Sequence, residues 1–326
     1  ELVSLIKGGD LRARDPEIFG ALGTVGRTSL ELRHHGVGNI VFCDGPAGLN
    51  VIEEAIVDEE GAEKPTKIPE KYNFGTFSSM AKPMVGTEGT QVYRYATAWP
   101  VEILLAQTWD LELMEEVGKA MGAELEEFGI TLLLAPGMNI HRNPLCGRNF
   151  EYFSEDPYLT GKLAAAQVKG TQSYEGIGLT VKHFCCNNQE DNRIGVSANI
   201  NERALREIYL KGFEIAVRES QPLALMSSYN RLNGTYTPNS YDLLTDILRC
   251  EWGYEGLVMT DWGSCAPGQG DPAKAAPAGN DLIMPGSNED RDAILKALEE
   301  GTMSESDLRS SAARVLRLVL NSQIYR

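Results

Sequence analysis

Short apolar runs that alternate with amphipathic helical segments constrain the fold of this chain more than any other feature. Residues 130–135 and 223–227 are typical of buried strands, whereas residues 110–128 carry apolar side chains at helical spacing and end at Gly129. This alternation predicts a mostly parallel sheet covered by helices. A chain of 326 residues is long for an ordinary domain but fits one (β/α)8 barrel of the TIM type, regular or irregular, over residues 1–326.

The remaining segments follow the same alternation. Further strands are expected at residues 38–43, 96–98, 179–181 and just before Asp261, and a further apolar segment at 281–284. Further helices are expected at residues 1–6, 157–173, 201–219, 241–249, 289–300 and 304–321. Residues 50–95 interrupt the pattern because they are rich in acids and turn formers without clear periodicity, which predicts a long insertion on the barrel rim, either a solvated loop or a lid.

Polar residues stand just past the ends of several predicted strands, namely Asp44, Lys182, His183, Tyr229 and Asp261. The strands of a closed barrel direct their carboxyl ends at one central mouth. An open doubly wound sheet concentrates function at one switch point instead, usually beside a glycine-rich phosphate loop. The chain contains neither GxGxxG nor GxxxxGK[ST], so the sequence favours a barrel and predicts no nucleotide site. Taken alone, Asp261 could equally be the N-cap of a helix.

Composition excludes several classes of partner. The net charge of −16 argues against nucleic acid and anionic membranes, and no apolar run is long enough to span a bilayer. The six cysteines include the adjacent Cys185 and Cys186 and form no CxxC pair, which predicts reduced thiols and a cytoplasmic protein. The four histidines show neither HxH nor HExxH spacing, so we expect no metal and no other cofactor. The oligomeric state, including a homo-oligomer, stays open.

The charged and aromatic residues at the predicted mouth have the composition of a sugar site. Carboxylates and guanidinium groups bind vicinal hydroxyls through charge-assisted hydrogen bonds, and Asp44 and Arg148 provide both types. The flat face of Trp262 suits the apolar face of a pyranose ring. A carboxylate under the anomeric carbon, such as that of Asp261, can act as a nucleophile and form a glycosyl-enzyme intermediate. Neighbouring cations would favour its ionised form.

Several motifs resemble, in content and in order, the catalytic barrel of glycoside hydrolase family 3, the family of retaining β-glucosidases. These motifs are DGP at 44–46, GRNFE at 147–151, KHF at 182–184, YN at 229–230, TDW at 260–262 and GNDLIMP at 279–285. The resemblance extends over roughly residues 30–290, and only the insertion at 50–95 has no counterpart. A single motif would be weak evidence, whereas the whole ordered series is specific.

The resemblance implies roles for individual residues. Asp261 matches the nucleophile that forms a covalent glycosyl-aspartate during release of a terminal sugar from a β-glycoside or oligosaccharide. The matching substrate-binding set consists of Asp44, Arg148, Lys182, His183, Arg193, Met226, Tyr229 and Trp262. Within it, Tyr229 steadies the nucleophile, and Met226 and Trp262 form the apolar wall. The resemblance leaves the glycone open between glucose, xylose and another sugar.

Each of these assignments has a simpler structural alternative. Arg148 could pair with Glu151 or Glu155 for structure alone, and His183 could be a core histidine with satisfied ring nitrogens. Asp156 beside Pro157 fits a helix start better than a catalytic acid. The whole chain could be a sugar-binding or scaffold barrel without activity.

One component of a retaining glycosidase has no match in the sequence. The leaving oxygen needs a second carboxyl group as general acid. In most of the family a companion α/β sandwich domain carries this glutamate, and one branch uses a histidine shortly after KHF. Residues 185–192 contain no histidine, which favours the glucosidase-like branch. We therefore expect the acid from a sandwich domain, upstream in a circularly permuted relative or on a separate chain; Glu190 and Glu155 are weaker local candidates.

Overall fold

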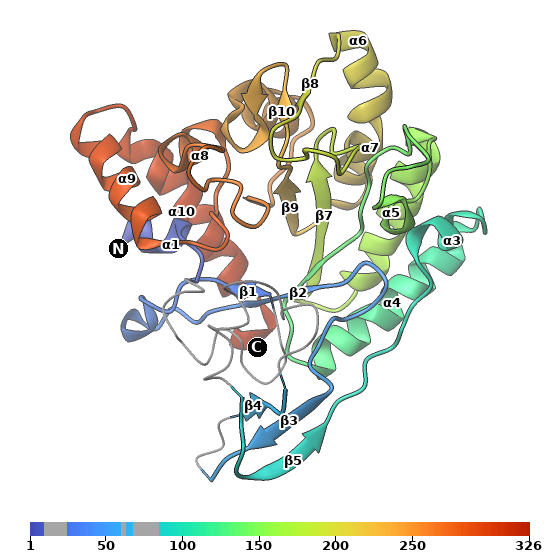
Figure 1. The fold of residues 1–326 in the computed structure, drawn as a ribbon, viewed down its shortest axis with the longest axis vertical. Helices are drawn as coiled ribbons and strands as arrows, with labels where there is room; N and C mark the ends of the chain where they lie inside the picture. The colour runs from blue at the N-terminus through green and yellow to red at the C-terminus, as the bar shows by residue number, and fades with distance from the viewer. Residues whose placement is uncertain (10–24, 60–62, 68–84) are drawn as a thin grey trace.

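A curved six-stranded sheet forms the centre of the molecule (Figure 1). The computed structural model describes residues 1–9, 25–59, 63–67 and 85–326. The sheet order is β1-β2-β6-β7-β9-β12, and all neighbours are parallel except β1 and β2. The strands are β1 (Gly26–Arg27), β2 (Val41–Asp44), β6 (Leu132–Leu134), β7 (Gly178–Phe184), β9 (Ala224–Ser227) and β12 (Leu257–Met259).

Two short segments outside these strands close the sheet into a ring. Leu282 pairs with the end of β12, and Ile283 pairs with Lys7, both in parallel orientation. The N–H of Gly9 then donates to the carbonyl of Arg27 in β1 at 2.9 Å. The apolar segment expected at 281–284 therefore forms two isolated β-bridges, one with β12 and one with Lys7. The α/β barrel predicted from the sequence is confirmed, in an irregular form.

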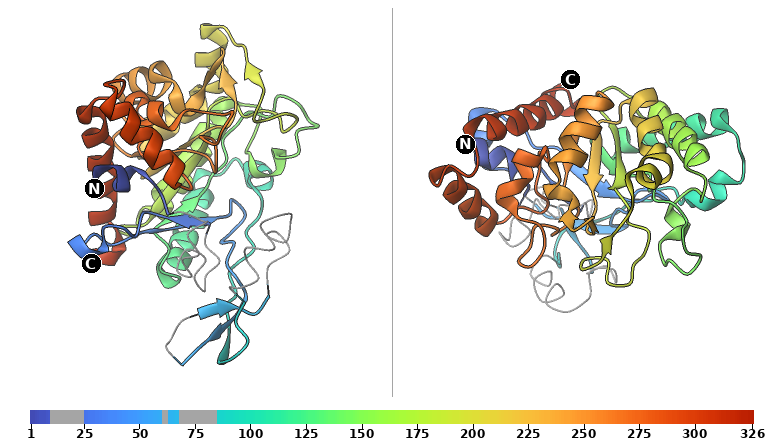
Figure 2. Two further views of the ribbon diagram at one scale, coloured as in Figure 1. Left: turned by 60° about the vertical axis from the view of Figure 1, so that its left-hand side comes forward. Right: turned by 90° about the horizontal axis from the view of Figure 1, so that it is seen from above.

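Helices cover the outside of the sheet on both sides, as two views show (Figures 1 and 2). One side carries α3 (Glu102–Ala106), α4 (Leu111–Glu127), α5 (Pro157–Thr171), α6 (Glu202–Ala204), the π-helical η5 (Leu205–Tyr209) and α7 (Lys211–Ser220). The other carries α1 (Leu2–Ile6), α8 (Pro272–Ala278), α9 (Asn288–Glu299) and α10 (Glu305–Leu320). Shorter or π-helical turns are η1 (Arg33–His35), η4 (Asn149–Glu151), η6 (Thr237–Asn239), η7 (Asp242–Glu251) and η8 (Gln323–Tyr325).

Local sequence signals determine where the main helices begin. The carboxylate of Asp110 accepts the N–H of Leu113 at the start of α4, and Asp156 caps α5 in the same way through Tyr158. Each such cap stabilises a helix by about 1 kcal/mol. Ser304 caps α10, where the helix predicted at 304–321 is confirmed. Asp156 is therefore a capping residue, as its position before a proline predicted.

Two glycines let α4 and α5 approach each other closely. A Cβ atom on Gly118 would lie 2.3 Å from the carbonyl oxygen of Gln167, and one on Gly170 would lie 2.1 Å from that of Glu115. Both contacts are to backbone atoms, so no side-chain adjustment could relieve them. The close packing fixes the helical layer against β6 and β7.

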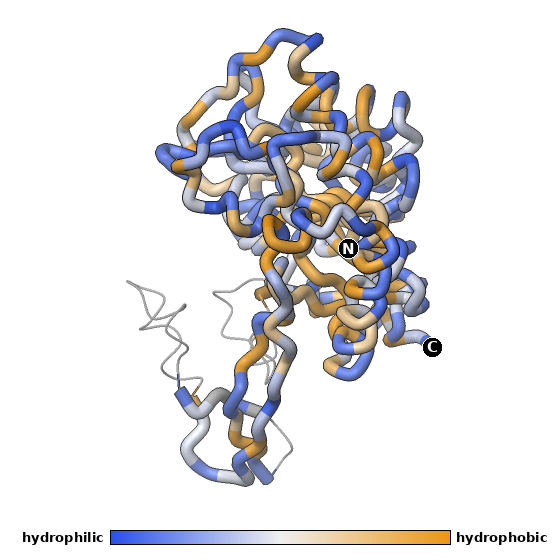
Figure 3. The backbone as a smooth tube through the Cα atoms, turned by 90° about the vertical axis from the view of Figure 1, so that its right-hand side faces the viewer, coloured by the Kyte–Doolittle hydropathy of each residue, from blue (hydrophilic) through white to orange (hydrophobic). Residues whose placement is uncertain are grey.

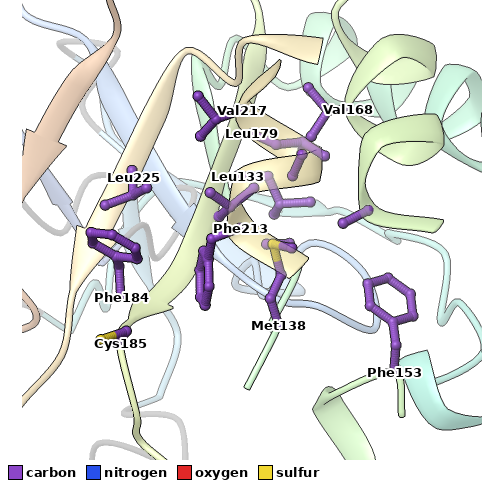
Figure 4. Close-up of a cluster of buried hydrophobic side chains, with 14 of the residues drawn as sticks. Leu133, Met138, Phe153, Val168, Leu179, Phe184, Cys185, Phe213, Val217 and Leu225 are labelled. Carbon is purple, nitrogen blue, oxygen red and sulfur yellow. The ribbon is translucent and has the colours of Figure 1, made fainter. Parts of the chain in front are cut away.

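The strands are buried on both faces, because successive side chains belong to different clusters. In β6, Leu132 and Leu134 point into the ring, whereas Leu133 packs outward under the helices. Figure 4 shows the outer cluster, in which Leu133 and Leu179 from the sheet lie near Phe213 and Val168 from α7 and α5. This two-sided burial explains why the strands read as continuous apolar runs.

The insertion at 50–95 contains a small sheet, which the sequence did not predict. β3 (Glu54–Val57) pairs antiparallel with β4 (Glu63–Pro65) and β5 (Thr90–Tyr93). This small sheet projects from the body of the molecule (Figures 1 and 3). Residues 60–62 and 68–84 of the insertion lie outside the described residues.

The strand predicted at 96–98 is wrong. These residues join no sheet. The N–H of Thr97 donates instead to the Glu124 carboxylate of α4 at 2.9 Å, so a side chain takes the hydrogen bond that a neighbouring strand would need. Small sheets also form from β8 (Ser197–Ala198), β10 (Arg231–Leu232) and β11 (Thr235–Tyr236).

Candidate active site

The predicted polar residues meet at the carboxyl ends of the barrel strands. Asp44 is the last residue of β2, Lys182 and His183 lie near the end of β7, and Tyr229 and Asp261 follow β9 and β12 by two residues. The carboxyl ends of barrel strands are the face on which enzymes of this architecture carry their active sites. The ring therefore brings together residues that are more than 200 positions apart in the chain.

Asp261 is buried, and one of its oxygens has no hydrogen bond from a described residue. The residue is 7% exposed, Oδ1 accepts the N–H of Trp262 at 2.7 Å, and Oδ2 has no hydrogen-bond partner in the part of the chain that the structure describes. The following residues form turns, and the next helix, α8, is capped by Asp271. The alternative of Asp261 as a helix N-cap is therefore wrong. Burial raises its pKa, and the charge of Arg148 limits this rise without reversing it.

His183 lies beside the Asp261 carboxylate, with Nε2 3.7 Å from Oδ2. Arg148 Nη2 lies 3.1 Å from Nε2, and the Tyr152 hydroxyl lies 3.2 Å from Nδ1. Because arginine only donates, Nε2 must accept and Nδ1 must carry the proton. Burial, followed by the charges of Arg148 and Lys182, holds the pKa of His183 well below its usual range, so the ring is neutral.

Both ring nitrogens of His183 have partners, as the core-histidine alternative expected. The backbone of His183 is held as well, since the side-chain amide of Asn139 exchanges two hydrogen bonds with its N–H and carbonyl at 3.0 and 2.9 Å. The imidazole nevertheless lies within the polar group at the barrel mouth, so its rigidity fixes its distance to Asp261.

Lys182 and Asp44 form an ion pair inside the mouth. Lys182 Nζ lies 3.0 Å from Asp44 Oδ1, and the lysine side chain is only 4% exposed whereas that of Asp44 is 42% exposed. Burial favours the neutral acid, but the charge and hydrogen bond of Lys182, together with the charge of Arg148 and the N–H of Gly45, hold the pKa of Asp44 below its usual range. Asp44 is therefore a carboxylate that faces solvent while a buried cation anchors it.

Arg193 joins the group through Tyr229 and Glu190. Its guanidinium carbon lies 4.7 Å from the centre of the Tyr229 ring, and Nη1 donates to Glu190 Oε2 at 2.9 Å. The Tyr229 hydroxyl donates to the carbonyl of Trp262 at 2.6 Å. Tyr229 thus holds the backbone directly after Asp261. Burial, followed by the charge of Asp261, raises the pKa of Tyr229, so the phenol stays protonated.

The two residues expected to form the apolar wall of the site, Met226 and Trp262, contribute in part to the barrel core. Met226 is 2% exposed and packs inside the ring, as expected for a residue of β9 that faces the barrel axis. Trp262 packs against the same cluster, and its indole N–H donates to the carbonyl of Val25 at 2.9 Å. The indole is thus fixed at both ends while part of it remains accessible.

Three further side chains belong to the group, although the sequence did not predict them as site residues. Glu151 pairs with Arg148. Tyr152 binds His183, and Glu190 lies between Arg148 and Arg193, 3.9 Å from Nη1 of Arg148. The GRNFE motif contains the signal for Glu151, because it places this acid three residues after Arg148. Arg148 combines both alternatives, because it pairs with Glu151 and also contacts His183.

The described residues were also compared with the sequence expectations for metal ligands, membrane spans, cysteines and a local general acid. They contain no group of three His, Cys, Asp or Glu residues that could hold a metal ion, and no helix there has the length and apolar character needed to cross a bilayer. All six cysteines are free thiols, and Cys185 Sγ lies 3.4 Å from Cys186 Sγ. Of the local acid candidates, Glu155 is exposed on the surface, whereas Glu190 belongs to the site.

A cavity of about 570 Å³ lies at the amino ends of the strands, and none of the site residues predicted from the sequence lines it. Its walls include Leu223 and Leu257, at the amino ends of β9 and β12, and Arg317 of α10. The amino ends of barrel strands serve stability rather than chemistry. The polar group at the carboxyl ends therefore remains the candidate site.

An irregular α/β barrel that brings carboxylates, cations and a neutral histidine together at its strand ends is the arrangement expected of a barrel glycoside hydrolase. The model of the glycosyl hydrolase family 3 N-terminal domain matches residues 32–318, so the chain belongs to this family.

The relatives of the chain are glycosidases. It is 40% identical over 285 residues to thermostable beta-glucosidase B of Acetivibrio thermocellus (87% of this chain, 33% of that protein). It is 46% identical over 224 residues to an exo-alpha-(1->6)-L-arabinopyranosidase of Bifidobacterium breve (69% and 29%). The structure of beta-glucosidase 3B from Thermotoga neapolitana in complex with glucose has a TM-score of 0.81 and 42% identity over 99% of this chain and 41% of that one. The chain thus spans about a third of the length of these curated relatives.

Proposed function

We propose that the protein is a retaining, exo-acting β-glycosidase of the β-glucosidase type. The observation that carries this proposal is Oδ2 of the Asp261 carboxylate, which is buried at the barrel mouth 3.7 Å from His183 Nε2 and accepts no hydrogen bond from the described residues. An unpaired carboxylate oxygen in such a place serves no packing purpose, because burial without a partner destabilises the fold. It suits attack on an anomeric carbon.

The other residues fit the recognition of a single terminal sugar. The Lys182–Asp44 pair offers an ammonium donor and a carboxylate acceptor for hydroxyls remote from the anomeric carbon. Arg148 and Arg193 add guanidinium donors, and Trp262 offers an apolar face. The cations around Asp261 would also balance the negative charge of the carboxylate until the glycosyl ester forms.

The mechanism needs a proton donor for the leaving oxygen. Glu190 is engaged with Arg193, so we assign the general acid to a companion domain outside the given sequence. The limited share of the relatives that this chain spans supports that assignment. A further proposal, a cytoplasmic location, rests on the cysteines of the sequence alone.

The proposal is tested with the full-length protein and an aryl β-glucoside. We expect hydrolysis with β-glucose as the first product seen by NMR, and loss of turnover in Asp261→Asn with an unchanged melting temperature. Asp271→Asn is the matched control, since asparagine also caps a helix and α8 should be retained. Release of α-glucose first, or turnover of Asp261→Asn at the wild-type rate, would contradict the proposal. To determine the preferred glycone, kcat/KM is also measured on aryl β-xylosides and aryl α-L-arabinopyranosides.

A further inference from the structure

Tyr152, the residue that follows η4, is a fully buried tyrosine that the proposed function does not use. The residue is 0% exposed, and its hydroxyl oxygen lies 3.2 Å from Nδ1 of His183 and 3.1 Å from Nδ2 of Asn187. A hydroxyl group can both donate and accept a hydrogen bond. The direction of these two hydrogen bonds therefore follows from the partners of Tyr152.

Arg148 determines the direction on the histidine side. Its Nη2 lies 3.1 Å from Nε2 of His183, and a guanidinium group has donors only, so Nε2 carries no hydrogen. The neutral imidazole then carries its one ring N–H at Nδ1. This N–H donates to the hydroxyl oxygen of Tyr152, which makes the tyrosine an acceptor for His183.

Glu190 determines the direction on the other side. The Glu190 carboxylate pairs with Arg193 and lies 3.5 Å from Nδ2 of Asn187, which is itself buried. Because a carboxylate only accepts, Asn187 must direct its NH2 group here, and the same group donates to the Tyr152 oxygen. A cation at one end and an anion at the other thus fix the direction of every hydrogen bond between them.

The position of the imidazole hydrogen decides what His183 presents to Asp261. Nε2 lies 3.7 Å from Oδ2 of Asp261, and without a hydrogen it cannot donate to this oxygen. This explains why Oδ2 accepts no hydrogen bond from the described residues although a ring nitrogen lies beside it. In the other tautomer, Nε2–H would donate to Oδ2. A hydrogen bond of this kind stabilises the charge of a carboxylate, so Oδ2 would be a weaker nucleophile.

We propose that Tyr152 is a positioning residue for the nucleophile: by accepting the hydrogen of Nδ1, its hydroxyl holds His183 in the tautomer that leaves Oδ2 of Asp261 free to attack. Tyr152 is fully buried and acts through His183. This inference rests on the function proposed above for the same site. Without the hydroxyl, Nδ1–H loses its acceptor, and the imidazole gains a hydrogen bond by carrying its hydrogen at Nε2 and donating it to Oδ2. Arg148 then loses its contact with Nε2 but keeps Glu151.

The kinetic test uses the full-length protein and a dinitrophenyl 2-fluoro-β-glucoside, which separates binding from attack. The wild type and Tyr152→Phe are compared by the inactivation rate constant at saturating reagent, kinact, and by the half-saturation constant, Ki. We expect Tyr152→Phe to lower kinact by about tenfold or more, the effect of one hydrogen bond to a charged group. Ki should stay within about threefold, because the residues that contact the sugar are unchanged.

Tyr254→Phe is the matched control. Tyr254 is 3% exposed, and its hydroxyl donates to the carbonyl of Leu257 at 3.0 Å, at the amino end of β12. Both variants lose one buried hydroxyl, so both should lower the melting temperature by similar amounts. Only Tyr152→Phe should lower kinact. An equal kinact in the two variants would show that Tyr152 contributes to the fold alone.

The tautomer is measured in the wild type, so this part of the test does not depend on the folding of a variant. The full-length protein is labelled with 15N at histidine and studied by solid-state NMR at pH 7, where protonated and bare ring nitrogens give well-separated signals. His183→Gln identifies the signals of His183 by difference. We expect a protonated Nδ1 and a bare Nε2 in the wild type, and a protonated Nε2 in Tyr152→Phe.

Distinct outcomes contradict the two proposals. A wild type that cleaves no β-glycoside and is not inactivated by the fluoroglucoside contradicts the function proposed for the site, whereas the NMR spectrum still decides the tautomer. An active wild type with a protonated Nε2 on His183, or an unchanged kinact in Tyr152→Phe, contradicts the role of Tyr152 alone. A Ki that rises while kinact stays the same would also overturn it, because Tyr152 would then serve glycone binding.

Discussion

Replacing Lys182 with methionine tests the glycone-binding group at its most buried cation. The ammonium lies 3.0 Å from Asp44 Oδ1, and its side chain is 4% exposed. Methionine keeps the length of the side chain and removes the charge and the three N–H donors. The substitution therefore removes the charge-assisted hydrogen bond that we propose Lys182 donates to a sugar hydroxyl, and it leaves Asp44 without its anchor.

The expected loss follows from the strength of such contacts. A hydrogen bond to a charged group contributes about 1.5–3 kcal/mol, which corresponds to about 10- to 150-fold in kcat/KM. The wild type and Lys182→Met are compared on an aryl β-glucoside, with circular dichroism melts to confirm the fold. Lys162→Met is the control, because Lys162 forms a surface ion pair with Glu219 at 2.8 Å, far from the mouth. An effect below threefold, or one equal to that of the control, would refute the reasoning.

The same variant changes the pH dependence in a defined direction. The folded-state pKa of Asp44 lies below its ordinary value because Lys182, together with Arg148 and the N–H of Gly45, more than offsets the effect of burial. The ionised Asp44 therefore stabilises the fold above its unfolded pKa, and this contribution is lost as the pH falls through the folded pKa. Without Lys182 the Asp44 pKa rises, so the acid limb of kcat/KM should move to higher pH. An acid limb that stays in place would show that Asp44 does not control it.

Two further predictions concern residues that hold the barrel and the nucleophile. Asp281 is fully buried and accepts hydrogen bonds from Arg249 at 2.6 Å and Arg314 at 2.8 Å. Because Asp281→Ala leaves two cations uncompensated, it should lower the free energy of unfolding, measured by chemical denaturation, by about 3–5 kcal/mol. A loss below about 1 kcal/mol would contradict this prediction. Tyr229→Phe removes the 2.6 Å hydrogen bond to the Trp262 carbonyl and should lower kcat about tenfold with little change in melting temperature, and an unchanged kcat would argue against its role beside Asp261.

The sequence predicted the barrel and most of the site because both depend on strand ends. Once the strands before Asp44, His183 and Asp261 are recognised, the geometry of a closed parallel sheet brings the three together. The helices were predictable from the periodic spacing of their apolar residues, and the starts of α4 and α5 from the capping residues Asp110 and Asp156.

The features that the sequence did not predict depend on contacts between distant residues. The antiparallel pairing of β3 with β5 brings together segments more than 30 residues apart that show no alternation, because neither face of that sheet is well buried. Glu102 follows Val101 in a segment that reads as an ordinary helix start with an acid in its first turn. Only the folded structure, in which α3 packs against η4 and α5, shows that this acid is buried.

The most direct test of the central claim is to trap the nucleophile. The full-length protein is incubated with a dinitrophenyl 2-fluoro-β-glucoside, whose leaving group needs no acid, and the labelled peptide is mapped by mass spectrometry. The account predicts one label per chain, on Asp261, and none in Asp261→Asn. A label on Asp44, Glu151 or Glu190, or steady hydrolysis of the parent glucoside without any label, would contradict it.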